Sequence, residues 1–384
     1  MNEGVVMATE RHAKKVAFLT PADPESVRTW SGIPYYSLKA LRDVFADVRC
    51  FPCPIAHNAR RVIQRLATPF GIDISREPLI STLYAAEING RLRRYDPDLI
   101  IGVSSSLQLY HRLLDVPTIY VADAVYAGIV DYYPPVGNRK THNRTRLMGD
   151  VQERTALNNS DAVVLCSDWA AKAAHQYYGV PESKINVVPF GANMSGDVDP
   201  AFDRQTEVCR LLFVGVDWER KGGPLVHQAT ELLRSRGIDV ELHIVGCRAP
   251  IPEAKYVFQH GFLRKSDPAD YARLQGLFRS SSLFFMPSQQ EAFGIVFAEA
   301  SAFGLPSVAS ATGGVPSAVR HGVNGFLLPE GAEAEAYADL IGDLWNDRER
   351  YKLLQRESWG LYQRELNWTA WASRTADISD RLFR

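Results

Sequence analysis

The stretch PSQQEAFGIVFAEA at positions 287–300 decides the fold of this chain, because it joins a strand to a helix and places two glutamates eight residues apart. The apolar run at 283–286 predicts a buried strand, and the proline and serine that open the stretch predict a turn. The small and apolar residues from Gly294 onward predict a helix. Glu291 is then expected just before the helix, and Glu299 two turns into it.

The spacing of the two carboxylates restricts the ligand that can lie between them. If all eight steps are helical, they rise about 12 Å, which exceeds the separation of about 5 to 9.5 Å between the carboxyl groups of glycosidases. The spacing suits a ligand with hydroxyl groups at both ends and an anion between them. The backbone N–H groups of Ala292, Phe293 and Gly294 are expected to face that anion. A sugar linked through a diphosphate to a ribose has this layout.

Several short motifs surround this stretch in the chain. They are FVG at 213–215, KG at 221–222, GLP at 304–306, GGVP at 313–316 and VNGFL at 323–327. With these neighbours, residues 205–330 resemble the retaining GT-B glycosyltransferases of family 4 (glycosyl transferases group 1), whose signature is two glutamates eight residues apart after Pro-Ser. Two glutamates at this spacing arise by chance in most proteins of this size, so the resemblance depends on the ordered motifs around them.

The length and the order of the predicted elements indicate two α/β domains. A chain of 384 residues is too long for one ordinary core. Runs rich in β-formers alternate with helical patterns, which predicts parallel sheets built from β-α-β units. The predicted strands lie at 16–20, 48–52, 99–103, 118–121, 162–166, 186–188, 211–216, 241–245, 283–286 and 307–309. The resemblance implies the GT-B fold, in which two Rossmann-like domains face each other across a cleft.

A turn-rich segment at 189–200 is the predicted linker between the domains. The resemblance then implies an acceptor-binding N-terminal domain at 1–190 and a nucleotide-sugar-binding C-terminal domain at 191–366. The tail at 367–384 is amphipathic, and we expect it to return to the N-terminal domain, as the last helix does in GT-B proteins.

Composition and charge narrow the class of protein. Apolar residues make up 46% and charged residues 23%, as in an ordinary soluble globular protein, and the net charge of −1 argues against bulk nucleic-acid binding. Five dispersed cysteines indicate reduced thiols, and Cys50 and Cys53 lack the partners of a zinc or redox site. Neither a signal-peptide pattern nor a run of about 18 apolar residues is present, so we expect a cytoplasmic location.

Lys221 is the predicted cation of the site, because it follows a buried strand in a loop where α/β folds bind ligands. Its ammonium group can neutralise a diphosphate as it leaves, whereas a solvated pair with Glu219 needs no ligand. The family commonly has Arg after the glycine of this loop, and this chain has Val216. Arg220 could replace that cation in a different register, which leaves the second cation of the phosphate site open.

By resemblance, Glu299 accepts hydrogen bonds from the ribose hydroxyl groups and Glu291 contacts a hydroxyl group of the transferred sugar. The alternatives are a solvent-facing carboxylate on the helix for Glu299 and stabilisation of the helix N-terminus by Glu291. The nucleobase is expected near Phe262 and Leu263, held largely by backbone groups. The glycines at 313–314 permit either a close approach of the backbone to a ligand or an ordinary turn.

The N-terminal half contributes candidates at the ends of two predicted strands. After the first strand, Gly32 resembles the family's glycine loop and can turn backbone amides toward a phosphate of the donor, and Ser31 can cap the following helix. Asp123 follows another strand, where the family often has a nearby His and this chain has Ala122. Asp123 has two alternative roles that the sequence does not distinguish, a polar contact with the sugar and a structural cap of the following turn. Candidates for the acceptor pocket are Trp30, Tyr35, Tyr126 and His142, with packing as the alternative for the aromatic rings.

The resemblance implies a retaining hexosyltransferase that moves a sugar from a UDP- or GDP-sugar to an acceptor hydroxyl group in the synthesis of a bacterial-type glycan, glycolipid or glycoside. Lys221, Glu291 and Asp123 are the expected catalytic residues. No cofactor and no metal is expected, because the sequence shows no cluster of metal ligands. The alternatives are a catalytically silent scaffold that binds nucleotide sugar, a relative acting on a non-sugar substrate, and a nucleotide-sugar epimerase. The phosphate-binding motifs of dehydrogenases and kinases do not follow any predicted strand.

Basic residues cluster in the first half of the chain at 60–65, 91–94 and 139–146. A short helix at 59–70 would carry on one side Val62, Ile63, Leu66 and Phe70. Such a helix can lie on an anionic membrane surface, which would make the protein peripheral at the inner membrane. A solvated helix beside an acceptor cleft is the alternative.

Overall fold

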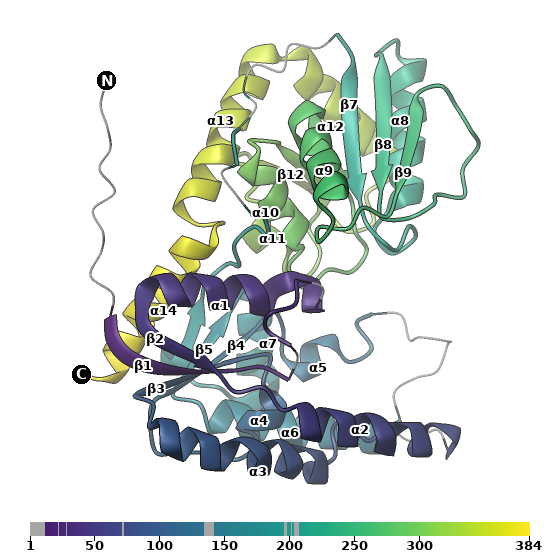
Figure 1. Ribbon diagram of the computed structural model, residues 1–384. Helices are drawn as coiled ribbons and strands as arrows, with labels where there is room; N and C mark the ends of the chain where they lie inside the picture. The colour runs from purple at the N-terminus through teal and green to yellow at the C-terminus, as the bar shows by residue number, and fades with distance from the viewer. Residues whose placement is uncertain are drawn as a thin grey trace, which may run out of the picture. The chain divides into compact units, whose positions relative to one another are not determined.

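The structure of the protein is a computed structural model, which describes residues 12–21, 23–27, 29–70, 73–133, 142–195, 198–200, 202 and 207–384. By packing, the chain divides into two compact units (Figure 1). Unit 1 comprises Met1–Leu165, Ala171–Val188 and Trp371–Arg384, and unit 2 comprises Cys166–Ala170 and Pro189–Ala370. The binding roles of the two predicted domains stay predictions, because this division reflects packing alone.

Unit 1 is built on one sheet of six parallel strands. In chain order they are β1 (His12–Leu19), β2 (Phe45–Cys50), β3 (Leu99–Val103), β4 (Thr118–Ala122), β5 (Ala162–Leu165) and β6 (Ile185–Val187). Their order in the sheet is β2-β1-β3-β4-β5-β6. The central strands β3, β4 and β5 are short apolar runs that are buried throughout, as expected for a parallel sheet covered on both faces.

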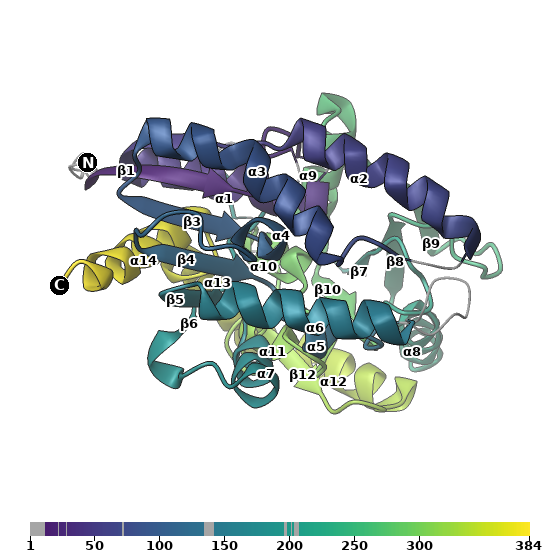
Figure 2. The ribbon, with the colours of Figure 1, turned by 90° about the horizontal axis from the view of Figure 1, so that it is seen from below.

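Helices cover both faces of this sheet. They are α1 (Ile33–Val44), α2 (Pro54–Ala67), α3 (Pro78–Tyr95), α4 (Ser106–Leu109), α5 (Tyr126–Ile129), α6 (Asn143–Asn158), α7 (Asp168–Tyr178) and α14 (Trp368–Leu382). The chain moves toward one edge of the sheet from β1 to β2 and toward the other edge from β2 to β5. Right-handed crossovers therefore place α1 on one face and α3, α4 and α6 on the other. Figure 2 shows α3 and α6 in front of the strands.

The C-terminal helix α14 begins in unit 2 and continues in unit 1. Trp371 is fully buried there. Lys14 on β1 forms an ion pair with Asp380 and donates a hydrogen bond to Ser379 at 3.1 Å. Arg381 donates to the Asn186 side chain at 2.8 Å. These contacts join the end of the chain to the first and last strands of the unit 1 sheet.

Unit 2 contains a second sheet of six parallel strands. They are β7 (Cys209–Val214), β8 (Val240–Val245), β9 (Val257–Gly261), β10 (Leu283–Met286), β11 (Ser307–Ser310) and β12 (Gly325–Leu328), in the order β12-β11-β10-β7-β8-β9. The helices are α8 (Gly223–Ser235), α9 (Pro268–Ser280), α10 (Ile295–Ala302), α11 (Val315–Ala318), α12 (Ala334–Asn346) and α13 (Arg348–Arg364).

The direction of the crossovers separates the helices of unit 2. The chain moves one way from β7 to β8 and the other way from β9 through β10 to β11. Right-handed crossovers place α8 on one face and α9 and α10 on the opposite face. Helix α12 packs beside α8, and Figure 1 shows α9 in front of the strands. The carboxyl ends of β7 and β10 thus lie where the strand order reverses, which is where open α/β sheets bind ligands.

The predicted parallel α/β architecture is confirmed, and ten predicted strands correspond to strands of the two sheets. The strands β9 and β12 were not predicted. Both lie at sheet edges, where β9 has the partly exposed sequence VFQHG and β12 has only four residues. Edge strands lack the continuous apolar run by which buried parallel strands are recognised in a sequence.

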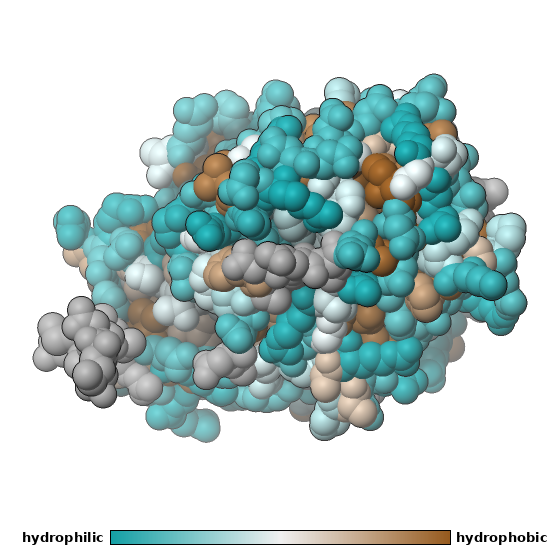
Figure 3. Space-filling model, turned by 90° about the horizontal axis from the view of Figure 1, so that it is seen from above, coloured by the Kyte–Doolittle hydropathy of each residue, from teal (hydrophilic) through white to brown (hydrophobic). Residues whose placement is uncertain are grey.

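The surface is that of an ordinary globular protein on the face drawn in Figure 3, where hydrophilic residues dominate and apolar residues form small separate patches. In the described part of the chain, no helix combines the length and the apolar character that a membrane span requires.

Candidate functional site

The turn between β10 and α10 brings Glu291 to the carboxyl edge of the unit 2 sheet. Gly294 is the N-cap of α10 with a positive φ of 79°, a conformation that favours glycine. The helix begins at Ile295, so only four of the eight steps from Glu291 to Glu299 are helical, which rise about 6 Å. The condition for a rise of 12 Å, eight helical steps, is not met because the first half of the motif is a turn, and Glu299 lies about one turn into the helix and not two as predicted.

Gly314 of the GGVP motif and the neighbouring Thr312 hold this turn. Gly314 N–H donates to the Glu291 carbonyl at 3.0 Å, and a Cβ at Gly314 would lie 1.8 Å from the Ala292 carbonyl oxygen. The close approach made possible by Gly314 is therefore an approach to protein backbone. Thr312 donates its hydroxyl hydrogen to the Gln289 carbonyl at 2.9 Å, which adds a second bond between the two segments.

Lys221 faces Glu291 across the edge of the sheet. Its Nζ forms an ion pair with the Glu291 carboxylate, and the glutamate is only 8% exposed. The partner is not Glu219, which was the alternative from the sequence. Gly222, with a φ of 78°, caps α8 directly after the lysine. This strand-loop-helix junction fixes the ammonium group beside the predicted sugar-binding carboxylate.

Arg220 points into a different set of contacts. Its guanidinium group donates to the Gln290 carbonyl at 3.0 Å and pairs with Asp217 at 3.3 Å. Val216, at the position where the family commonly has Arg, is exposed. Arg220 therefore ties the β7–α8 loop to the turn that carries Glu291, and its contact with a phosphate stays a prediction.

Glu299 on α10 is buried, with 2% of its surface exposed, so the solvent-facing alternative is excluded. Lys265, from the loop between β9 and α9, forms an ion pair with its carboxylate. Lys265 also donates to the Asn193 carbonyl at 3.2 Å. Burial raises the pKa of Glu299, while Lys265 and hydrogen bonding from the Asn193 backbone oppose the rise.

Lys265 was missed in the sequence because it lies 34 residues from Glu299 and belongs to none of the motifs. The sequence does give one indication of such a cation. The helix IVFAEASA has a single glutamate among apolar and small residues, and a buried carboxylate requires a partner. That signal predicts a cation without identifying which one.

The residues predicted near the nucleobase follow β9. Phe262 is 61% exposed and Leu263 is buried. A cavity of about 500 Å³ extends to Gly261, the residue before Phe262, but neither Phe262 nor Leu263 lines it. Its lining consists of Cys247, Arg248, Glu253, Ala254, Val257, Gln259 and Gly261. An exposed aromatic ring can stack on a planar base, so the place of the nucleobase near Phe262 stays a prediction.

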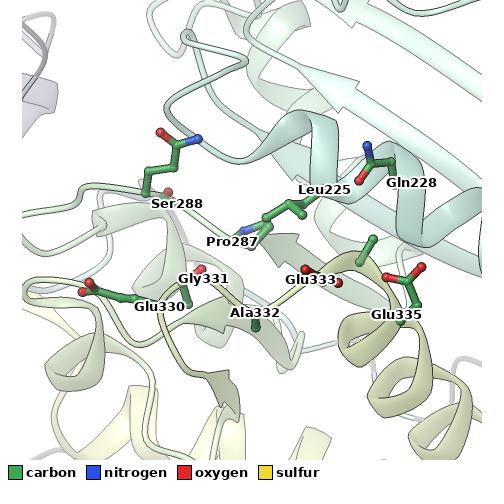
Figure 4. Close-up of a pocket in the computed structure, with 12 residues that line it drawn as sticks. Leu225, Gln228, Pro287, Ser288, Glu330, Gly331, Ala332, Glu333 and Glu335 are labelled. Carbon is green, nitrogen blue, oxygen red and sulfur yellow. The ribbon is translucent and has the colours of Figure 1, made fainter.

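A second cavity of unit 2, of about 680 Å³, opens between the β10–α10 turn and the start of α12 (Figure 4). Its lining includes the buried Ser288 hydroxyl, which makes no hydrogen bond with described residues. Glu333 and Glu335 lie at the N-cap and in the first turn of α12, where negative charge stabilises a helix. None of the predicted donor residues lines this cavity.

In unit 1, the segment after β1 has an unusual backbone. Trp30 and Ser31 have φ values of 43° and 55°, a conformation that is rare for residues other than glycine. Gly32, with a φ of 87°, is the N-cap of α1, so the suggested cap by Ser31 was wrong. Pro34 lies in the first turn of α1, where proline is tolerated. Trp30 and Tyr35 are half-buried, and their contact with an acceptor stays a prediction.

The remaining candidates of unit 1 lie around β4 and α6. Asp123 follows β4 and is half-buried. The Tyr126 hydroxyl donates to the Thr145 carbonyl at 3.2 Å, and His142 caps α6 by accepting from the Arg144 N–H at 3.2 Å. Tyr126 and His142 therefore have structural partners, and their acceptor roles stay predictions.

A buried polar cluster in unit 1 was also missed. Tyr120 on β4 donates to the Glu153 carboxylate at 2.8 Å. Arg76 donates to Gln152 at 2.9 Å and to Ser106 at 3.2 Å. Burial raises the pKa of Glu153, and Arg76 opposes the rise. These residues come from four separate segments, so no sequence spacing identifies them.

No group of three or more His, Cys, Asp and Glu residues is placed to hold a metal ion in the part of the chain that the structure describes. What the unit 2 site offers is two buried carboxylates, two lysine ammonium groups and the N-terminal end of a helix. Carboxylates accept from hydroxyl groups, and ammonium groups bind phosphate oxygens.

Comparison with known proteins agrees with this arrangement. Residues 209–347 match the family model "Glycosyl transferases group 1", and residues 38–195 match "Glycosyltransferase Family 4". The D-inositol 3-phosphate glycosyltransferase of Jonesia denitrificans is 31% identical over 209 residues, which are 49% of each chain. The chain aligns with about half of the length of such curated relatives.

Solved structures share the fold across nearly the whole chain. Sucrose-phosphate synthase of Thermosynechococcus elongatus has a TM-score of 0.67 and 19% identity, covering 96% of this chain and 99% of that one. The Anabaena protein HepE, solved with UDP and glucose, has a TM-score of 0.58 and 18% identity, covering 96% and 100%. The two family matches together span more than half of the chain, which therefore belongs to the group 1 glycosyltransferases of family 4 and has their GT-B fold.

Proposed function

We propose that the protein transfers a hexose-type sugar from a nucleoside diphosphate sugar to an acceptor hydroxyl group, with retention of configuration. The observation that carries this proposal is the pair of buried glutamates of the 287–300 stretch, each paired with a lysine at the carboxyl edge of the unit 2 sheet. The relatives named as glycosyltransferases and the neighbour solved with UDP support a nucleotide-sugar donor.

Each group has a defined part in the proposed reaction. The Glu299 carboxylate accepts from the ribose hydroxyl groups, and Glu291 accepts from a hydroxyl group of the sugar. Lys221 neutralises the diphosphate as negative charge develops on it. The departing phosphate oxygen takes the acceptor proton on the same face of the sugar, so no covalent enzyme intermediate forms. The protein contributes positioning and electrostatic stabilisation.

The base, the sugar and the acceptor belong to the same proposal. We propose a UDP- or GDP-sugar, with the base beside Phe262 and Leu263. Asp123 is the proposed N-terminal contact with the sugar, and Gly32 the proposed backbone contact with a phosphate. The acceptor is a hydroxyl-bearing glycan, glycolipid or glycoside, contacted from Trp30, Tyr35, Tyr126 and His142.

Donor binding and product analysis test the proposal. Calorimetric titration with UDP, GDP and ADP should show one that binds, and Glu299→Gln should weaken it about tenfold or more, because a neutral amide replaces a charged acceptor. Glu335→Gln on α12 is the matched control and should bind normally. If neither UDP nor GDP binds the wild-type protein, the proposed donor is wrong.

The proposed retention of anomeric configuration and the proposed independence of metal ions are tested on the product of the reaction. The anomeric proton signal of the product is recorded by NMR with and without EDTA. We expect the anomeric configuration of the donor to be kept and the rate to be unchanged by the chelator. An inverted linkage, or activity that chelation abolishes and Mg²⁺ restores, contradicts this part. Donor binding without any transfer, or with epimerised nucleotide sugar as the product, would favour the alternatives.

We also propose that the acceptor is presented at an anionic membrane surface. In the structure α2 exposes Ile55, Val62 and Leu66, at 74%, 56% and 69%, with spacings of seven and four residues that place them on one side of the helix. Arg61 and Arg65 are exposed beside them. Ile63, predicted on the same side, is half-buried; the side chain of Phe70 and the basic residues at 139–140 lie outside the described residues.

Co-sedimentation with vesicles containing about one third anionic lipid tests this contact. The wild-type protein should bind at low salt and be released at high salt. The variant Val62→Ser/Leu66→Ser should lose binding, whereas Leu353→Ser, which changes an exposed leucine of α13, should not. No binding by the wild-type protein leaves a soluble or polysaccharide acceptor as the better proposal.

A further inference from the structure

A lysine from a distant segment contacts the carboxylate that the proposed function assigns to the ribose. The Lys265 Nζ donates to the Glu299 Oε1 and to the Asn193 carbonyl, 3.2 Å away. Lys265 lies between β9 and α9, whereas Glu299 lies on α10. One ammonium group thus joins the buried carboxylate to the segment after Pro189, where the chain re-enters unit 2.

The burial of Glu299 makes this cation necessary. A carboxylate that is 2% exposed has lost its hydration, and without a partner it takes up a proton instead of remaining charged. A protonated carboxyl group becomes a hydrogen-bond donor and has less capacity to accept. Ribose hydroxyl groups would then meet a poorer acceptor.

The surroundings of the pair hold it in place. Asn193 is fully buried, and its side-chain oxygen accepts from Trp368 Nε1 at 2.8 Å. Burial raises the pKa of Tyr271 on α9, and the negative charge of Glu299 adds to this rise. The Tyr271 hydroxyl accepts from the Ser195 N–H at 2.7 Å. In the described part of the chain, Lys265 is the charged side chain that lowers the pKa of Glu299.

We propose that Lys265 is a positioning residue of the donor site, which keeps Glu299 charged and directed toward the ribose. The inference rests on the proposed binding of a nucleotide sugar. The bond to Lys265 uses Oε1, and a carboxylate has about four lone-pair sites, so capacity to accept from a ribose diol remains. Lys265 itself need not touch the donor.

The test measures donor affinity against pH. The probe is whichever of UDP, GDP and ADP binds the wild-type protein most tightly, together with its 2′,3′-dideoxy analogue, which lacks the ribose hydroxyl groups. Lys265→Met should weaken the ribonucleotide about tenfold or more near pH 6.5 and recover affinity as Glu299 loses its proton at higher pH. The affinity of the wild-type protein should change much less over the same pH range. Lys265→Arg keeps the positive charge and should therefore retain most of the wild-type affinity.

The analogue and two further variants separate this role from a general effect on structure. Affinity for the dideoxy analogue should change less than about twofold in Lys265→Met, because the lost contact is absent from that ligand. Lys255→Met, at an exposed lysine, is the matched control. The double variant Lys265→Met/Glu299→Gln removes both charges of the pair, so it should fold even where the single variant does not, and should bind without pH dependence.

The outcomes distinguish the inference from the function on which it rests. If no nucleotide binds the wild-type protein, the proposed donor fails. If the nucleotide binds, and Lys265→Met leaves its affinity and pH dependence unchanged, or weakens both ligands equally at every pH, the positioning role is wrong.

Discussion

At the residue scale, two neighbouring cations at the β7–α8 junction have different partners. Lys221 pairs with Glu291, whereas Arg220 is held by Asp217 and the Gln290 carbonyl. The lysine is thus next to the carboxylate assigned to the sugar, and the arginine joins two loops. This difference predicts different kinetic effects for the two side chains.

We expect Lys221→Met to lower kcat about 10²- to 10³-fold with a smaller effect on donor affinity, because its charge matters most as the phosphate leaves. Arg220→Met should change kcat less than about tenfold. Steady-state kinetics of sugar transfer, combined with titration of the nucleotide, separate the two parameters. Equal losses of kcat in both variants would show that the lysine has no special place in the reaction.

Residues within one motif were accessible from the sequence, since Glu291, Gly294 and Glu299 lie in a single stretch and Lys221 follows a recognisable strand. Lys265 and the Arg76–Glu153 cluster could not be predicted from the sequence. Their partners come from segments 34 and 77 residues away, so no periodicity or spacing records the contact. Long-range pairs of this kind become visible only when the fold is known.

At the element scale, the unpredicted edge strand β9 carries a chain of imidazole contacts. His260 stacks on His243 of β8, with ring centroids 5.3 Å apart, and its Nδ1 lies 2.9 Å from Arg273 of α9. Burial, His243 and Arg273 together lower the pKa of His260 to about 4. Strand β9 was not predicted because it contains polar side chains, although His260 contacts the neighbouring strand β8 and helix α9.

This lowered pKa predicts a stability change in acid. The unfolded chain binds a proton at His260 near the ordinary pKa of about 6.5, and the folded chain binds it only near pH 4. The contribution of His260 to the free energy of unfolding is therefore fully present above about pH 6.5, and it is lost as the pH falls toward 4. Because His260 is partly exposed, we expect its share to be on the order of 1 kcal/mol.

Urea unfolding at about pH 7 and pH 5 measures this effect. His260→Gln should show a smaller loss of stability between the two pH values than the wild-type protein. Gln228→Ala, on α8, removes no titratable group and serves as the control, which should retain the wild-type pH dependence. An unchanged difference in His260→Gln would mean that other groups cause the acid destabilisation.

At the scale of the whole molecule, the sequence predicted two α/β sheets because buried parallel strands have continuous apolar runs. The short segment Cys166–Ala170 packs with unit 2, although it lies within the N-terminal half of the sequence. No composition change marks that segment. Both α7 and α14 continue from unit 2 into unit 1, so the two units share helices at their boundaries.

The fully buried Trp371 of α14 provides a test of whether each unit has its own stability. We expect Trp371→Ala to destabilise unit 1 by about 3–5 kcal/mol, because a large buried side chain is lost. Hydrogen exchange followed by mass spectrometry should then show faster exchange in β1 to β6 than in β7 to β12.

A bound nucleotide at about 100 times its Kd should add about 2.7 kcal/mol of protection against hydrogen exchange. This protection should be concentrated in unit 2, where the proposed donor residues Lys221, Glu291 and Glu299 lie. Equal acceleration of exchange in both sheets would show instead that the two units unfold together, and that α14 links their stabilities as well as their chains.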